Sequence, residues 1–294
     1  MFGIPMLAAL FTASLAQPAQ TAPPTVPEGD IVVEGKRVKR EQLRDFIHAL
    51  TNVPNLGQIG RFHSAICPGV VGLPEQQARL IAVRMRRVAA AGAIRVAPAK
   101  CTPNVFLIVA PNKNSAIHQL YTQFPAYFGD LTYNQVRDMA DAPKPAAAWQ
   151  VKGLVSADGI ELRKVGGAGY YINEGTNSGS RIRSGTMPDF VASVVVVDLQ
   201  AIGGLSVTQV ADYAAMRAFA DTDPARAAQS GAPTILTILD AASNQEVPLS
   251  LTHWDLGYLK SLYTTSNAYY ATYQRGDMEH VLKKELAQSG KPGN

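Results

Sequence analysis

The chain has 294 residues, of which 47% are of hydrophobic type and 17% are charged. This composition excludes an intrinsically disordered chain, and the length allows one large domain or two small ones. The net charge of +4 is spread along the sequence. It does not form the basic, aromatic-rich stripe of nucleic-acid binders, so we expect no nucleic-acid partner.

The first 30 residues predict export. Residues 1–16 form an uncharged apolar stretch that ends in small residues, as a signal peptide does, although no Lys or Arg precedes it. Residues 17–29 are rich in Pro, Ala and Thr and are expected to be a disordered linker. The apolar stretch is too short to span a bilayer. We therefore predict a periplasmic or secreted protein with no integral membrane segment after signal cleavage.

The chain contains two cysteines, Cys67 and Cys101. An isolated pair in an exported protein favours a disulfide bond. Neither cysteine has a second ligand at Cys-x-x-Cys or Cys-x-x-His spacing, so a zinc site is not expected. The alternative is a pair of separate thiols, in which case Cys67 could act as a nucleophile paired with His63.

Apolar residues recur either at helical spacing or in continuous runs, which are the patterns of amphipathic helices and of fully buried strands. Strands separated by helices predict a single layered domain of the α/β (α+β) class over residues 30–294, with a core at about 40–290 and a mixed central sheet. In chain order, we expect helices over 40–50 and 74–91, a buried strand over 104–110, a helix ending at Pro125, a β-hairpin over 149–165, an exposed glycine-rich loop over 166–185, a buried strand over 190–197, a helix over 206–220, an apolar turn over 233–239, a helix over 252–263 and a last helix from Asp277.

Two of these segments carry specific local signals. Ser206 and Gln209 form the pattern of a capping box at the start of the helix over 206–220. This helix is apolar on nearly all sides, so we expect it at the centre of the protein. The Asp-Gly pair at 158–159 predicts the turn of the hairpin.

The chain lacks the motifs of the common exported enzymes. It contains no Gly-x-Ser-x-Gly nucleophile elbow, no phosphate-binding loop and no dinucleotide-binding Gly-x-Gly-x-x-Gly. Its five histidines include no pair at i, i+4 spacing, the arrangement with which a helix binds zinc. We therefore assign no catalytic residue, no metal ligand and no cofactor, and the favoured interpretation is that the protein is not an enzyme.

The order of the elements between residues 100 and 265 resembles that of zincin-type metallopeptidases, and more closely that of exported bacterial proteins with a zincin-like architecture. The segment Leu251–Tyr263 carries the resemblance, because it matches the pattern Leu-Thr-x-x-Asp-x-x-x-Leu-x-x-Leu-Tyr. In an active zincin the central helix carries His-Glu-x-x-His, whose histidines bind zinc. The helix over 206–220 has no histidine, and at most Asp212 stands where the glutamate would be. The resemblance therefore implies a pseudo-peptidase without metal.

The preferred hypothesis is an exported, non-catalytic module that binds a protein or peptide of the cell envelope. A zincin-like cleft beside the central helix would form the binding site. Its candidate residues are Asp212, Tyr213, Met216 and His253.

The first alternative is a hydrolase without a recognisable motif. Its base would be His63, His118 or His253, brought next to a nucleophile or a carboxylate only by folding.

The second alternative is an accessory protein of TonB-linked envelope transport. The segment 30–35 resembles the short energy-coupling box of TonB-dependent receptors. Ile31, Val32 and Val33 would then add a strand to the sheet of a partner protein. Otherwise, this segment is simply an edge strand of the domain.

Overall fold

The structure is a computed structural model that describes residues 39–165, 170–241 and 245–289. The chain divides into two compact units, Met1–Asp30 and Ile31–Asn294. The first unit lies wholly outside the described residues. The predicted signal peptide and the linker therefore lie outside them, and so does the candidate partner strand over 31–33 at the start of the second unit.

Four strands form the central sheet: β1 (Pro68–Val71), β2 (Val105–Ala110), β3 (Ala146–Ser156) and β6 (Thr186–Asp198). Their order across the sheet is β1–β2–β6–β3. β1, β2 and β6 run parallel to one another, and β3 runs antiparallel to β6. This arrangement confirms the predicted α/β class and the mixed central sheet.

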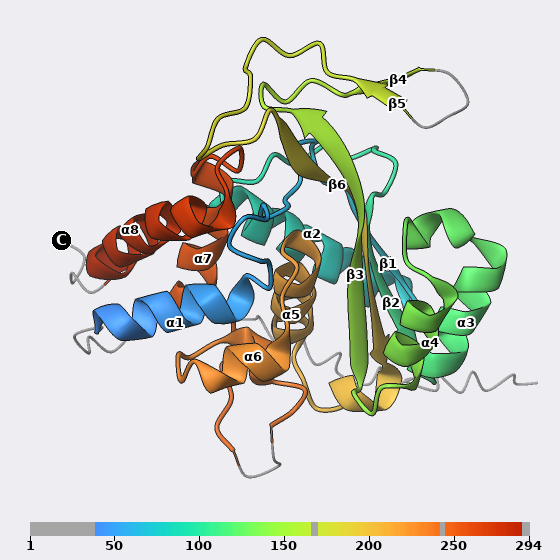
Figure 1. The fold of residues 1–294 in the computed structure, drawn as a ribbon. Helices are drawn as coiled ribbons and strands as arrows, with labels where there is room; N and C mark the ends of the chain where they lie inside the picture. The colour runs from blue at the N-terminus through green and yellow to red at the C-terminus, as the bar shows by residue number, and fades with distance from the viewer. Residues whose placement is uncertain (1–38, 166–169, 242–244, 290–294) are drawn as a thin grey trace, which may run out of the picture. The chain divides into compact units, whose positions relative to one another are not determined.

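Helices cover both faces of the sheet (Figure 1). α3 (Lys113–Gln123) and α4 (Tyr133–Asp141) lie on one face, whereas α2 (Glu75–Ala91) and α5 (Val207–Phe219) lie on the other. The chain passes from β2 to α3 on the first face and from β6 to α5 on the second. The connections that follow these two neighbouring strands therefore lead to opposite faces of the sheet.

The remaining helices lie on the same side of the sheet as α2 and α5 (Figure 1). No helix in the described ranges has the length and apolar character that crossing a membrane requires. The helices on this side, besides α2 and α5, are α1 (Arg40–Leu50), α6 (Pro224–Gln229), α7 (His253–Thr264) and α8 (Ala271–Ser289). Elsewhere in the chain, short 3₁₀ helices span Pro125–Phe128, Leu199–Ile202 and Ile235–Thr237.

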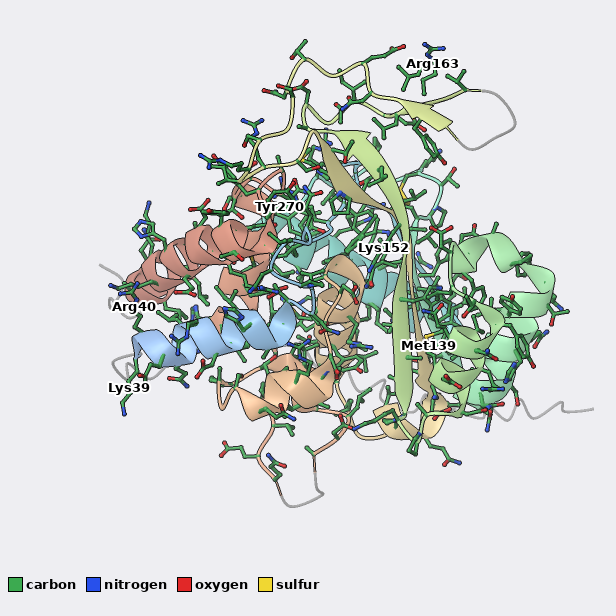
Figure 2. The ribbon with its side chains drawn as sticks, viewed as in Figure 1. Lys39, Arg40, Met139, Lys152, Arg163 and Tyr270 are labelled. Carbon is green, nitrogen blue, oxygen red and sulfur yellow. A yellow bond between two sulfur atoms is a disulfide. The ribbon has the colours of Figure 1, made fainter. Side chains whose placement is uncertain are left out.

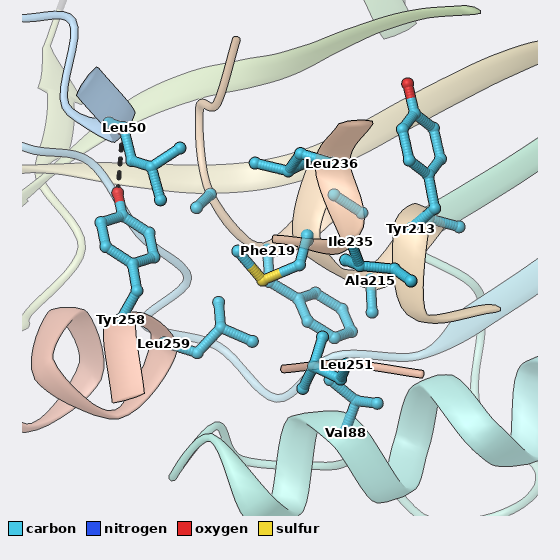
Figure 3. Close-up of a cluster of buried hydrophobic side chains, with 14 of the residues drawn as sticks. Leu50, Val88, Tyr213, Ala215, Phe219, Ile235, Leu236, Leu251, Tyr258 and Leu259 are labelled. Carbon is cyan, nitrogen blue, oxygen red and sulfur yellow. Dashed lines mark hydrogen bonds between the residues drawn. The ribbon is translucent and has the colours of Figure 1, made fainter. Parts of the chain in front are cut away.

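α5 is the buried centre of the second face, which confirms the helix expected there. Every residue from Gln209 to Phe219 is buried. The predicted capping box is present, because Gln209 N donates to Ser206 Oγ and Ser206 N donates to Gln209 Oε1. Figure 3 shows Phe219 of α5 within an apolar cluster that also contains Val88 and Leu259. Each large apolar side chain buried in this way stabilises the fold by about 1.5–3 kcal/mol.

The hairpin predicted over 149–165 is wrong, although its turn exists. Gly159 adopts a positive φ of 80°, as the Asp-Gly turn requires, but only one isolated bridge, between Val155 and Glu161, follows it. β3 instead pairs along its whole length with β6, since the apolar run in β6 offers a longer and buried partner. The second, two-stranded sheet joins β4 (Arg163–Val165) to β5 (Tyr170–Ile172), and β5 lies inside the segment expected to be a loop.

Two helices differ from the sequence-based expectation. α4 is absent from the prediction because it buries only Val136 and Ala140, too few apolar residues to form a visible period. Its start is nevertheless marked by a capping box of Thr132 and Gln135. α8 begins at Ala271, earlier than the expected start at Asp277.

A disulfide joins Cys67 and Cys101, as predicted. The two Cα atoms are 6.1 Å apart, and the sequence separation is 34 residues. The bond ties the residue that precedes β1 to the segment that leads into β2. Cys67 is therefore not a free thiol, which overturns the alternative of a nucleophile paired with His63.

Replacing both cysteines with serine should lower the free energy of unfolding by about 3–4 kcal/mol, because a cross-link over a loop of this length restricts the unfolded chain. Urea denaturation of the parent and of the Cys67→Ser/Cys101→Ser variant measures the difference. The parent protein treated with dithiothreitol is a control without substitutions and should lose a similar amount. A loss below about 1 kcal/mol in both would contradict the prediction.

Candidate functional site

β3 is an edge strand with an outer side that has almost no partner. Within the described ranges, residues 146–154 pair only with β6. An unpaired strand edge presents backbone N–H and C=O groups that another chain can pair with. The outer side of β3 is therefore a candidate binding surface.

One hydrogen bond establishes which groups of β3 point outward. Asp198 N donates to Pro145 O, so the residue pair just before β3 is of the hydrogen-bonded kind. Antiparallel pairs alternate between hydrogen-bonded and non-hydrogen-bonded kinds. The backbone groups of Ala146, Ala148 and Gln150 therefore point away from β6, toward the open edge.

A second hydrogen bond agrees with this register, and a bulge limits it. Ser193 of β6 lies opposite Gln150, and it donates its N–H to Asn104 O, away from β3. The pairing then shifts at a bulge between Val151 and Lys152. The regular open edge thus covers the first half of β3.

A cavity of about 100 Å³ lies where β3 begins. A cavity of this volume holds several water-sized groups. It lies between the first residue of β3, the buried helix α5 and the start of α6. The lining residues that bear on its chemistry are Lys144, Ala146, Tyr213, Arg217, Asp223 and Asp240.

Arg217 is the buried charge of this cavity. The residue is only 8% exposed. Its Nη1 donates to Thr222 O, whereas its Nε is buried and has no hydrogen-bond partner among the described residues. No carboxylate of the described part lies within ion-pair distance of the guanidinium. A buried charge without a counter-charge is costly.

Tyr213 adds a second hydrogen-bond donor. Its hydroxyl points away from the apolar cluster in Figure 3, and it has no hydrogen-bond partner in the described ranges. Burial raises the pKa of this hydroxyl; Arg217 opposes the rise, and the carboxylates of Asp240 and Asp223 add to it. The hydroxyl is therefore protonated at neutral pH and able to donate.

The remaining charges of the cavity are exposed and already engaged. Lys144 Nζ lies 3.5 Å from Asp240 Oδ1. Asp223 is the N-cap of α6, where its Oδ1 accepts a hydrogen bond from Ala225 N. Water solvates these side chains, so the unmet demand in the cavity is that of the buried guanidinium for an acceptor.

Asp212, proposed from the sequence as a cleft residue, lies in the core. Its carboxylate is fully buried and forms two hydrogen bonds with Arg84 of α2: Nε to Oδ1 at 2.7 Å and Nη2 to Oδ2 at 2.9 Å. It also accepts a hydrogen bond from Leu251 N at 2.6 Å. This carboxylate thus links α5 to α2 and to the segment before α7 by hydrogen bonds.

The other proposed cleft residues do not gather at one place. Met216 is fully buried in the apolar core, and His253 is the first residue of α7. Of the four candidates, only Tyr213 lines the cavity beside β3.

Asp255, next to His253 in the same turn, serves the helix start. It is fully buried. Its carboxylate accepts hydrogen bonds from the side chains of Thr234 and Thr252 and from the backbone N–H groups of Ile235 and Thr252. The role that the sequence indicates, a partner of Thr252 in a capping box, is present in the structure.

His63 does meet a carboxylate, that of Asp189, which lies 126 residues away in the sequence. Its Nδ1 lies 3.1 Å from Asp189 Oδ1, and its Nε2 lies 3.3 Å from Asn267 Oδ1. The backbone N of His63 also donates to Asp189 Oδ1 at 2.8 Å. Both ring nitrogens therefore lie within hydrogen-bond distance of another side chain, and the arrangement joins three segments of the chain.

His118 lies near a second, wider cavity of about 460 Å³. Its Nε2 is 4.0 Å from Asp141 Oδ1, an oxygen that already accepts a hydrogen bond from Asn114. Lys113 in this cavity donates through Nζ to three backbone carbonyl groups and through its backbone N to Asp198. The polar groups named here are thus satisfied within the protein, and they define no particular ligand.

The residues of the central helix do not fit the zinc that an active zincin would hold. Asp212, the one carboxylate at the relevant place, is committed to Arg84. In the part of the chain that the structure describes, no three His, Cys, Asp or Glu side chains come together as a metal site.

Comparisons with protein-family models, with curated proteins and with solved structures found no match to this chain.

Asp212→Ala should lower the free energy of unfolding by about 3–5 kcal/mol, because it leaves the Arg84 guanidinium and the Leu251 N–H without their partner. Asp212→Asn is the matched control: it retains the shape and one acceptor, and the loss should be about 1–3 kcal/mol. Urea denaturation at pH 7 measures both. Equal stability of the parent and the Ala variant would refute the structural role.

The titration of Asp255 should make stability depend on pH. Burial raises the pKa of Asp255 to about 6, although its four hydrogen bonds oppose the rise. This pKa exceeds the unfolded value of 3.8, so between these two pH values the folded state binds more protons than the unfolded state. The stability that the protonated Asp255 contributes is fully present below pH 3.8 and is lost as the pH rises through the folded pKa. The free energy of unfolding of the parent, minus that of Asp255→Asn, should therefore fall by about 2–3 kcal/mol from pH 4 to pH 7.

Denaturation curves of both proteins across this pH range provide the measurement. The Asn variant corrects for all other titrating groups, because they are common to both proteins. A difference that stays constant, or that grows with pH, would show that the four hydrogen bonds outweigh burial.

Proposed function

We propose that this protein is an exported, non-catalytic peptide-binding module of zincin-like architecture, which takes an extended segment of a cell-envelope protein as an added strand on β3. The observation that carries the proposal is the open first half of β3. There, the backbone groups of Ala146, Ala148 and Gln150 point outward beside a cavity lined by Arg217, whose buried Nε has no partner among the described residues.

Strand addition uses these groups directly. Main-chain hydrogen bonds supply affinity, and the alternate side chains of the added segment supply specificity. A typical hydrogen bond contributes about 0.5–1.5 kcal/mol net. Three outward residues therefore support binding of modest strength, to which the cavity would add.

The two halves of β3 differ in a way that favours this use. Natural edge strands are protected by bulges and by lysine side chains. In β3 both devices occur at the same place. The bulge follows Val151, and Lys152, which is labelled in Figure 2, forms an ion pair of 2.8 Å with Asp221. The stretch from Ala146 to Gln150 carries neither device and is left free to pair.

The zincin-like part of the proposal rests on the resemblance seen in the sequence, which the pattern of Leu251–Tyr263 carries. The apolar stretch over 1–16 and the disulfide favour an exported protein. His63 lies beside the carboxylate of Asp189, but it lines neither of the two cavities described above.

Ala148→Pro should weaken peptide binding by about tenfold or more, because it removes an outward N–H and places a ring against the incoming strand. Ala148→Val is the matched control, since it changes the side chain and retains the N–H. The probe is a set of peptides selected on the parent protein from a random display library. Affinities for the parent and both variants are measured by fluorescence anisotropy.

Amide hydrogen exchange of the parent tests the same point without a substitution. The Ala148 and Gln150 amides should exchange quickly in the free protein and slowly in the complex. Failure to select any peptide, or equal binding to Ala148→Pro with unchanged exchange at both amides, would refute strand addition.

A further inference from the structure

The cavity beside β3 is lined by a buried arginine that has no carboxylate within ion-pair distance among the described residues. Arg217 is 8% exposed as a residue, its Nε is buried without a partner among these residues, and the acceptor found for its Nη1 is the neutral carbonyl of Thr222. Arginine pairs most strongly with planar anionic groups that accept two hydrogen bonds at once, above all a carboxylate. The missing partner is therefore an anionic acceptor.

The acidic residues of the cavity do not remove this demand. Asp240 faces Lys144, and Asp223 caps α6. Both of these residues are exposed, whereas Arg217 is a buried residue. Tyr213 offers one more donor at the same cavity. Two donors that lack acceptors favour the same ligand chemistry.

The direction of β3 places a particular atom group at this cavity. Ala146 is both the first residue of β3 and part of the cavity wall. A strand added antiparallel to β3 runs in the opposite direction, so it reaches the cavity at its own carboxyl end. Antiparallel addition thus brings a chain terminus to Arg217.

We infer that the cavity binds the C-terminal carboxylate of the added peptide, with Arg217 and Tyr213 as hydrogen-bond donors. This inference rests on the proposed strand addition and narrows it to segments that end in a free carboxyl group. The volume of about 100 Å³ favours a last residue with a small side chain. Arg217 and Tyr213 are then specificity-determining residues of the binding site.

The central test changes the peptide and leaves the protein intact. Selected peptides are synthesised as free acids and as C-terminal amides, and their affinities for the parent are compared. The acid should bind at least tenfold more tightly, because the amide carries no charge. Equal affinity of the acid and the amide would overturn the inference.

Two variants assign the effect to the cavity. Tyr213→Phe should weaken the acid severalfold and leave the amide unchanged, and Arg217→Lys should reduce the preference for the acid by more. Ala148→Pro should weaken both peptide forms equally, because it acts on the edge of β3. A preference for the acid that survives in both Tyr213→Phe and Arg217→Lys would also overturn the inference.

These outcomes separate the inference from the proposed function. If the acid and the amide bind alike while Ala148→Pro weakens both, strand addition stands and carboxylate recognition fails. If no peptide is selected, strand addition fails, and N-acetylalanine becomes the probe of the cavity. Its binding to the parent, lost in Arg217→Lys, would support a site for a free small carboxylate, and the absence of binding would overturn that as well.

Discussion

The constraint on which the rest of this structure depends is the complete burial of α5 beneath the sheet. A polar group carried into such an environment needs a hydrogen-bond partner or a counter-charge. Gln209 meets this need by capping the helix and by donating to Pro248 O. Asp212 meets it through Arg84 and the N–H of Leu251. The same interactions join α5 to its neighbours, so the polar residues of the helix also define how the helices around it pack.

Tyr213 and Arg217 differ from the other polar residues of this helix, because neither has a full set of partners within the described protein. Both lie at the cavity where β3 begins, the point at which the sheet also leaves backbone groups unpaired. A single ligand can satisfy both deficits only if it is extended and ends in an acceptor. The proposal therefore joins two features with separate origins, the edge of β3 and the interior of α5, in the binding of one peptide terminus.

The sequence predicts those parts of the molecule that depend on neighbouring residues. The capping box of Ser206 and Gln209 and the apolar surface of α5 specify a central helix, and an isolated cysteine pair in a chain predicted to be exported indicates the disulfide. The hairpin fails because β3 prefers a distant partner in β6 to a nearby one. The site fails for the same reason: nothing near Arg217 in the sequence shows that its guanidinium lacks a counter-charge, which only the fold decides.

An open edge creates a risk that two copies of the protein pair through β3, and the cavity bears on this risk. The β3 strand of a second copy is internal to its chain, so it brings no terminal carboxylate to Arg217. Self-pairing would thus cover the guanidinium with neutral backbone, which raises the cost of burying its charge. The bulge and Lys152 restrict pairing along the second half of the strand. In the proposed complex, Arg217 would therefore act in two ways: it would favour a chain terminus and disfavour an internal strand, as specific interfaces require.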